Sequence, residues 1–239
     1  MDSRIVAALA AVGGVLLAGP AHACGVSATG VASCSLAEHE EELRPRWAVG
    51  LSGLYTSTGL RFSDSLHADQ KRYAVSAALA YLPTSKLVLQ LSAGAAVAGE
   101  LVVDGQAHEF SPGPLVALGA DYRVFESKYV FVLLTSSLSF TAAQTQLNDE
   151  PSEGYQALDL RVGGALGFKL GRIFRPYALA RLFGGPVFWR YGGSAVTGTD
   201  TRHYQLGAGL ALALSMFNAA LEGAPLGEQA LALTLGAAF

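Results

Sequence analysis

Residues 229–239 read QALALTLGAAF and place a larger, mostly apolar side chain at every second position. Successive side chains of a β-strand point to opposite faces, so this period of two predicts a strand with one apolar face. A helix would scatter the same residues around its circumference. One row consists of Gln229, Leu231, Leu233, Leu235, Ala237 and Phe239, and the other of Ala230, Ala232, Thr234, Gly236 and Ala238.

The same alternation recurs along the chain from residue 46 to residue 239. Ten segments carry it, starting near Arg46, Arg72, Leu87, Pro114, Tyr129, Gln156, Arg175, His203, Phe217 and Gln229. Lipid offers no hydrogen bonds to a sheet edge, so a membrane sheet must close, and an even strand number allows antiparallel closure. We therefore predict an all-β fold, a closed antiparallel up-and-down transmembrane β-barrel of about ten strands.

A helical membrane protein is the main alternative, because residues 129–148 and 204–221 are free of charge over the length of a spanning helix. Polar residues recur inside these stretches, however, and the basic loop asymmetry of helical bundles is missing. The composition, with 51% hydrophobic and 15% charged residues, fits either membrane class. The period of two favours the barrel.

The links between the predicted strands alternate in length, which is typical of barrels with short periplasmic turns and longer extracellular loops. The short links are 83–86, 126–128, 170–174 and 215–216, and the longer ones are 63–70, 100–112, 144–154 and 192–202, with 224–227 as a short exception. Aromatic side chains favour both membrane interfaces. We expect one girdle of Trp47, Tyr81, Tyr122, Phe168, Tyr177, Phe217 and Phe239, and a second of Tyr55, Tyr73, Phe140, Trp189 and Tyr204.

These features resemble the small outer-membrane β-barrel proteins of Gram-negative bacteria over residues 46–239. The terminal strand resembles the barrel-assembly signal of that group. The resemblance implies an outer-membrane location, lipids of that membrane as partners, and contact with the barrel-assembly machinery during biogenesis. It assigns the assembly signal to Leu233, Leu235, Ala237 and Phe239.

The N-terminus predicts an export signal over residues 1–23, with Arg4, an apolar run and a small-residue cleavage region. Cys24 and Cys34 would then be exported, which favours a disulfide between them. Lipidation of Cys24 is the alternative. A metal site that includes His39 fits poorly, because the spacing of these residues matches no compact zinc site. Residues 24–45 are expected to form a periplasmic segment with a short helix, since Ser35 and Glu38 make a capping box. The alternative is a plug whose acidic run, residues 38–42, meets luminal arginines.

Charged residues within the predicted strands share the row opposite the apolar one, because a charge facing lipid is costly. We expect an ion-paired lumen built from Arg72, Asp121, Arg123, Asp159, Arg161, Lys169 and Glu222. Arg181 shares a row with Tyr177 instead, so either a bulge near Ala180 or a Tyr177 that faces the lumen is required.

The sequence favours a structural or surface-interaction barrel with a constricted lumen, and a narrow pore for small solutes is the alternative. A hydrolase is a third possibility, with a histidine of the predicted loops as base. Its candidate residues are His67, His108 and His203 with Asp64, Asp69, Asp104, Glu109, Asp149, Glu150 and Asp200. We assign no catalytic residue, metal or cofactor. The net charge of -3 argues against nucleic acid as a partner.

Overall fold

The computed structural model describes residues 47–62, 66–147, 152–214 and 217–239, which form strands joined by turns. No helix in these ranges is long and apolar enough to cross a membrane. The strands are β1 Trp47–Arg61, β2 His67–Tyr81, β3 Leu87–Val103, β4 Gln106–Ser111, β5 Gly113–Glu126, β6 Val130–Gln146, β7 Glu153–Phe168, β8 Phe174–Gly184, β9 Val187–Tyr191, β10 Ser194–Asp200, β11 Tyr204–Leu214, β12 Phe217–Gly227 and β13 Gln229–Ala238.

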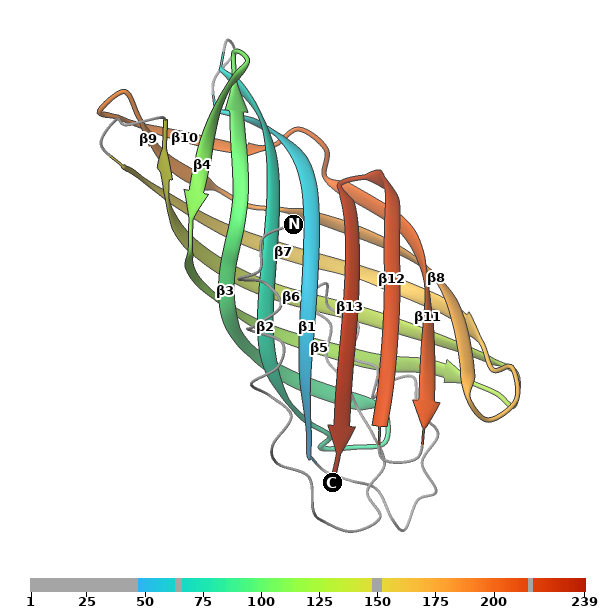
Figure 1. Cartoon of the computed structure of the whole chain (residues 1–239). Helices are drawn as coiled ribbons and strands as arrows, with labels where there is room; N and C mark the ends of the chain where they lie inside the picture. The colour runs from blue at the N-terminus through green and yellow to red at the C-terminus, as the bar shows by residue number, and fades with distance from the viewer. Residues whose placement is uncertain (1–46, 63–65, 148–151, 215–216) are drawn as a thin grey trace, which may run out of the picture.

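Ten of these strands form a closed antiparallel ring, which confirms the predicted barrel (Figure 1). The ring runs β1, β2, β3, β5, β6, β7, β8, β11, β12, β13 and back to β1. Closure rests on the β1/β13 pair, whose register extends from Ala48 opposite Ala238 to Ser57 opposite Gln229. Neither strand is therefore left as an edge.

The apolar row of each strand faces outward. Leu231 and Leu233 of β13 are 53% and 52% exposed, and similar side chains surround the ring. The inward row is mostly small or polar, as with Ser52 and Ser76, whose hydroxyl oxygens lie 2.8 Å apart. An exposed apolar belt of this extent suits lipid rather than water.

Both termini of the ring lie at one end, here called the terminal end, where the Trp47 amide donates to the Phe239 carbonyl. At the opposite end, called the loop end, several expected loops are strands. Residues 67–70 begin β2, and residues 100–112 and 192–202 contain the β3–β4 hairpin and β10. The outward row of these extensions is mostly polar, as with His67, Asp69 and Glu109, so it lacks the apolar pattern used to locate strands.

Two tight turns explain why the missed strands form hairpins. Asp104 and Gly105 both have positive φ between β3 and β4, and Gly192 and Gly193 both have positive φ between β9 and β10. Paired positive φ values define the type I′ turn that matches the twist of a two-residue hairpin. The Asp-Gly and Gly-Gly dipeptides are the sequence signals that predict both hairpins.

The wall of the barrel is completed by β10 where the β12–β13 hairpin ends early (Figure 1). β1 pairs with β13 only as far as Ser57, and beyond it Leu60 and Arg61 pair with Asp200 and Thr199 of β10. The Thr201 amide also donates to the Gly59 carbonyl at 2.8 Å. β10 therefore takes the place of β13 as the neighbour of β1 beyond the end of the β12–β13 hairpin.

Candidate functional site

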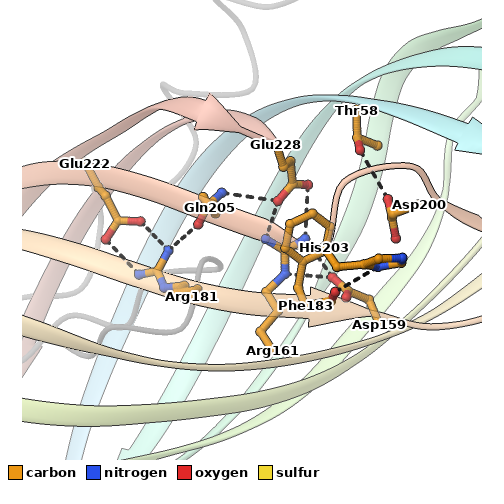
Figure 2. A network of polar contacts seen from close by, with 10 residues as sticks. All are labelled: Thr58, Asp159, Arg161, Arg181, Phe183, Asp200, His203, Gln205, Glu222 and Glu228. Atoms are coloured by element: carbon orange, nitrogen blue, oxygen red, sulfur yellow. Dashed lines mark hydrogen bonds and ion pairs between the residues drawn. The ribbon is translucent and has the colours of Figure 1, made fainter.

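Arg181 of β8 lies at the centre of a buried ion pair inside the barrel (Figure 2). Its two terminal nitrogens donate to the two carboxylate oxygens of Glu222 on β12 at 2.7 and 3.0 Å. The same group donates to Gln205 Oε1 of β11 at 2.8 Å, and the Tyr177 hydroxyl donates to Glu222 at 3.1 Å. The two charged side chains are 1% and 4% exposed, so their interaction is shielded from water.

Tyr177, Leu179, Arg181 and Phe183 all face the interior, so the strand keeps a regular alternation at Arg181. Of the two explanations offered above, the lumen-facing Tyr177 holds. The expected place of Tyr177 in an aromatic girdle is therefore wrong.

Two glycines make room for the large inward side chains of β8. Gly163 of β7 lies opposite Arg181, and Gly209 of β11 lies opposite Tyr177. A Cβ on Gly163 would lie 2.3 Å from the Ala180 carbonyl oxygen and 2.6 Å from Cγ of Arg181, and one on Gly209 would lie 2.4 Å from the Tyr177 ring. Gly163 therefore allows the main chain and the arginine of β8 to approach closely, and Gly209 allows the Tyr177 side chain to do so.

Arg161 of β7 holds two carboxylates together nearer the loop end. Its Nε donates to Asp159 Oδ2 at 2.6 Å, and its terminal nitrogens donate to both carboxylate oxygens of Glu228. Gln205 Nε2 donates to Glu228 at 3.1 Å, and thereby joins this group to the Arg181 pair. The result is a continuous network across β7, β8, β11 and β12, which we call the interior network (Figure 2): Asp159, Arg161, Arg181, Gln205, Glu222 and Glu228.

A second group, the loop-end core, fills the barrel beyond the interior network. It consists of Leu60, Phe62, Ala68, Leu101, Val103, Phe110, Tyr155, Val187 and Trp189. The Trp189 indole donates to Thr145 Oγ1 at 2.8 Å, and its ring packs against Phe62, His108 and Tyr191. Trp189 is 2% exposed, so its expected place in the outer girdle is wrong. This core brings together side chains from β1, β2, β3, β4, β7 and β9 at the loop end.

Asp200, at the end of β10, lies on the loop-end side of the interior network (Figure 2). It accepts a hydrogen bond from Thr58 Oγ1 at 3.2 Å, which joins β10 to β1. Burial raises its pKa to about 6, and the negative charges of Asp159 and Glu228 add to this rise. Asp200 lies beyond Tyr204 on the loop-end side, outside the apolar belt.

The raised pKa predicts a pH-dependent effect of Asp200→Asn. The folded state holds the proton of Asp200 more tightly than the unfolded chain, so the stability from this group is complete below about pH 4 and is lost as the pH rises through about 6. We expect Asn, which keeps the Oδ1 acceptor, to stabilise the protein at pH 7.5 by up to about 3 kcal/mol and to be neutral at pH 4. Urea unfolding in phospholipid vesicles at both pH values measures this difference; an equal effect at the two pH values would contradict it.

A third charged group, the basic cluster, lies inside the terminal end and consists of Arg123, Lys169 and Arg175. Glu126 forms ion pairs with Arg123 and with Lys169, the latter at 2.6 Å. Arg175 donates to the Gly171 carbonyl at 3.1 Å. All three cationic side chains are buried.

The structure places the seven predicted lumen charges on the inner side of the wall. Arg161 pairs with Asp159, whereas Arg123 pairs with Glu126. Arg72 reaches across to Thr141 Oγ1 of β6 at 3.2 Å, and Asp121 is buried. Sequence reasoning missed Glu228, Gln205 and Glu126 because they sit at strand ends or turns.

The candidate histidines do not form an acid–base group in the part of the chain that the structure describes. His67 and His203 are exposed, whereas His108 is buried against Trp189. Within the described ranges no histidine forms a hydrogen bond or ion pair with a carboxylate; His203 Nδ1 contacts the Phe183 carbonyl at 3.2 Å. Asp64, Asp149 and Glu150 lie outside those ranges, as do the predicted signal peptide, Cys24, Cys34 and residues 24–45.

No metal site is found either, since the described ranges contain no group of three His, Cys, Asp or Glu side chains placed to hold an ion.

Solved structures with the same kind of barrel resemble this chain. The outer membrane protease OmpT from Escherichia coli matches with a TM-score of 0.53 and 9% identity, over 81% of this chain and 96% of the other. The outer membrane protein OprG from Pseudomonas aeruginosa matches with a TM-score of 0.46 and 10% identity, over 82% and 96%. No family model and no curated protein sequence matches. The chain has the fold of outer-membrane β-barrel proteins.

Proposed function

We propose that this protein is an integral outer-membrane β-barrel with a closed lumen, and that it serves a structural or surface-interaction role. The observation that carries the proposal is the filling of the interior. The interior network lies on the inner side of the neighbouring strands β7, β8, β11 and β12, and the loop-end core packs side chains from β1, β2, β3, β4, β7 and β9 beyond it. A solute entering from either end meets buried ion pairs or packed aromatic rings.

The location follows from the fold and the outer surface. The belt of exposed leucine, valine and aromatic side chains suits the lipids of the outer membrane. We assign the terminal end to the periplasm and the loop end to the cell exterior. The assembly machinery would engage the outward row of β13, where Leu233, Leu235 and Phe239 are exposed.

Two other functions remain as alternatives to the closed barrel. A narrow pore would require a water path past Arg161 and Arg181. Hydrolysis at the loop end would require His67 or His203 to form a hydrogen bond with a carboxylate side chain of the protein when substrate binds. The described contacts favour neither, because both terminal nitrogens of Arg181 donate to Glu222 and His203 contacts a main-chain carbonyl.

A liposome-swelling assay tests the closed lumen. Vesicles that contain the purified protein should swell in glycine or arabinose no faster than empty vesicles, because in this proposal the ion pairs and aromatic rings block the path of water. A known general porin provides the positive control. Swelling at a rate that rises with the amount of protein would favour the pore.

Export and oxidation of the N-terminal segment also belong to this proposal. The mature chain would begin at Cys24 and carry a Cys24–Cys34 disulfide. The mass of the intact mature protein tests both the N-terminus at Cys24 and the loss of two hydrogens in the disulfide. A mass that includes an acyl chain would favour lipidation of Cys24 instead.

A further inference from the structure

Three turns at the terminal end each carry one exposed cation. Lys86 lies in the β2–β3 turn, Lys128 in the β5–β6 turn and Arg172 in the β7–β8 turn. None of the three side chains forms an ion pair in the part of the chain that the structure describes. We call these three residues the turn cations.

The carboxylates of the described residues at this end have other places. Glu126 forms ion pairs with two buried cations, and Asp121 faces the interior at 1% exposure. At the loop end, by contrast, exposed side chains of both signs occur, as with Arg61 and Asp69. The outer surface of the described turns at the terminal end is therefore of one sign.

The three turns are neighbours along the end of the barrel. The Arg123 amide of β5 donates to the Lys86 carbonyl at 2.8 Å, and the Lys169 amide donates to the Tyr129 carbonyl at 2.8 Å. Neighbouring strands lie about 4.8 Å apart, so successive hairpins are about 10 Å apart. That spacing is close to the Debye length of about 8 Å at physiological ionic strength, so the turn cations attract an anionic surface together.

The turn cations lie beside outward-facing aromatic rings. The Lys128 ammonium lies 5.3 Å from the centroid of the Tyr129 ring, and Tyr129 is 63% exposed. Phe168 and Phe174, which flank the turn that holds Arg172, are each 50% exposed. Exposed aromatic side chains favour the interface between membrane and water. The cations beside them are therefore at the height of lipid head groups.

We propose that the turn cations bind the phosphate groups of anionic phospholipids in the periplasmic leaflet. This inference rests on the membrane location and orientation proposed above, and it adds the class of lipid at the terminal end; it does not depend on a closed lumen. Ammonium and guanidinium groups bind phosphate through charge-assisted hydrogen bonds. Each such cation near an anionic membrane surface raises affinity about fivefold at low ionic strength.

Fluorescence quenching by brominated lipids tests this preference in the full chain reconstituted into vesicles. Tyr129→Trp, combined with Trp47→Phe, places an indole beside Lys128, while the buried Trp189 adds a constant background. Brominated phosphatidylglycerol should quench the introduced indole more effectively than brominated phosphatidylcholine, with a relative binding constant of about 5 at low salt. The constant should fall towards 1 at 1 M salt, where the Debye length is about 3 Å.

Two pairs of substitutions in this reporter protein locate the preference. Lys128→Gln/Arg172→Gln should lower the relative binding constant at least threefold. Arg61→Gln/Arg190→Gln is the matched control, because it removes two exposed cations near the loop end and should leave the constant unchanged. An equal fall in the control pair would overturn the proposal, since the preference would then follow net charge rather than the turn cations.

The same measurement separates the lipid preference from the proposed membrane location. Quenching by both lipids with a relative binding constant of 1 would overturn the role of the turn cations and leave the membrane location intact. No quenching by either lipid would overturn both proposals. Both leaflets of the vesicles have the same composition, so the result does not depend on the direction in which the barrel inserts.

Discussion

Replacement of Arg181 by alanine is expected to lower the free energy of unfolding by about 3 to 5 kcal/mol. The loss arises because Glu222, only 4% exposed, would keep its charge inside the barrel without the guanidinium that holds both its oxygens. Water that enters the space left by the arginine would place the loss at the lower end of this range. Urea unfolding in phospholipid vesicles measures it.

The double variant Arg181→Ala/Glu222→Ala should be more stable than Arg181→Ala alone, because Glu222 is then no longer left buried without its partner. Lys71→Ala serves as the control for removing a cation from an ion pair. Lys71 pairs with Glu100 at 2.7 Å, but both side chains are exposed, so little change is expected. An Arg181→Ala variant as stable as the wild type would show that the buried pair contributes nothing to the fold.

Replacement of Trp189 by alanine is expected to cost about 3 to 5 kcal/mol as well, for a different reason. The indole fills the centre of the loop-end core, and its removal leaves a cavity among Phe62, His108 and Tyr191. It also removes the hydrogen bond to Thr145. The same unfolding measurement applies, and a blue-shifted tryptophan emission that disappears with the mutation would report the burial of this side chain.

Phe188 provides the matched control because it is the neighbour of Trp189 on β9 and faces outward at 48% exposure. Phe188→Ala should cost much less, since no interior cavity forms. Equal losses at the two positions would mean that the loop-end core is not packed as the structure has it.

The sequence predicts the ring of strands because lipid imposes a strict period of two, and ten predicted segments coincide with the ten strands of the ring. β13 is the clearest case, with Leu231, Leu233 and Leu235 all exposed. Strand segments that extend beyond the lipid need no outward apolar row. The outer faces of β4 and β10 are polar, so they were interpreted as loops despite the turn signals at Asp104-Gly105 and Gly192-Gly193.

The interior was less predictable from sequence. Alternation identifies Asp159 and Arg161 as inward residues, but their partner Glu228 comes from the β12–β13 turn, where alternation carries no information. Trp189 was assigned to a girdle because an amphipathic aromatic ring fits a membrane interface and a buried core equally well. Which of the two holds depends on the height of β9 in the barrel, and that height is set by strand tilt and register.

Single-channel recording in planar lipid bilayers tests the closed lumen most directly. The intact protein should insert and give at most rare, small current steps, because we propose that the Arg181–Glu222 pair and the loop-end core close the path. Trp189→Ala, tested in parallel, should raise the frequency of steps. Large, steady currents from the unmodified protein would contradict a closed lumen and would make the protein a pore.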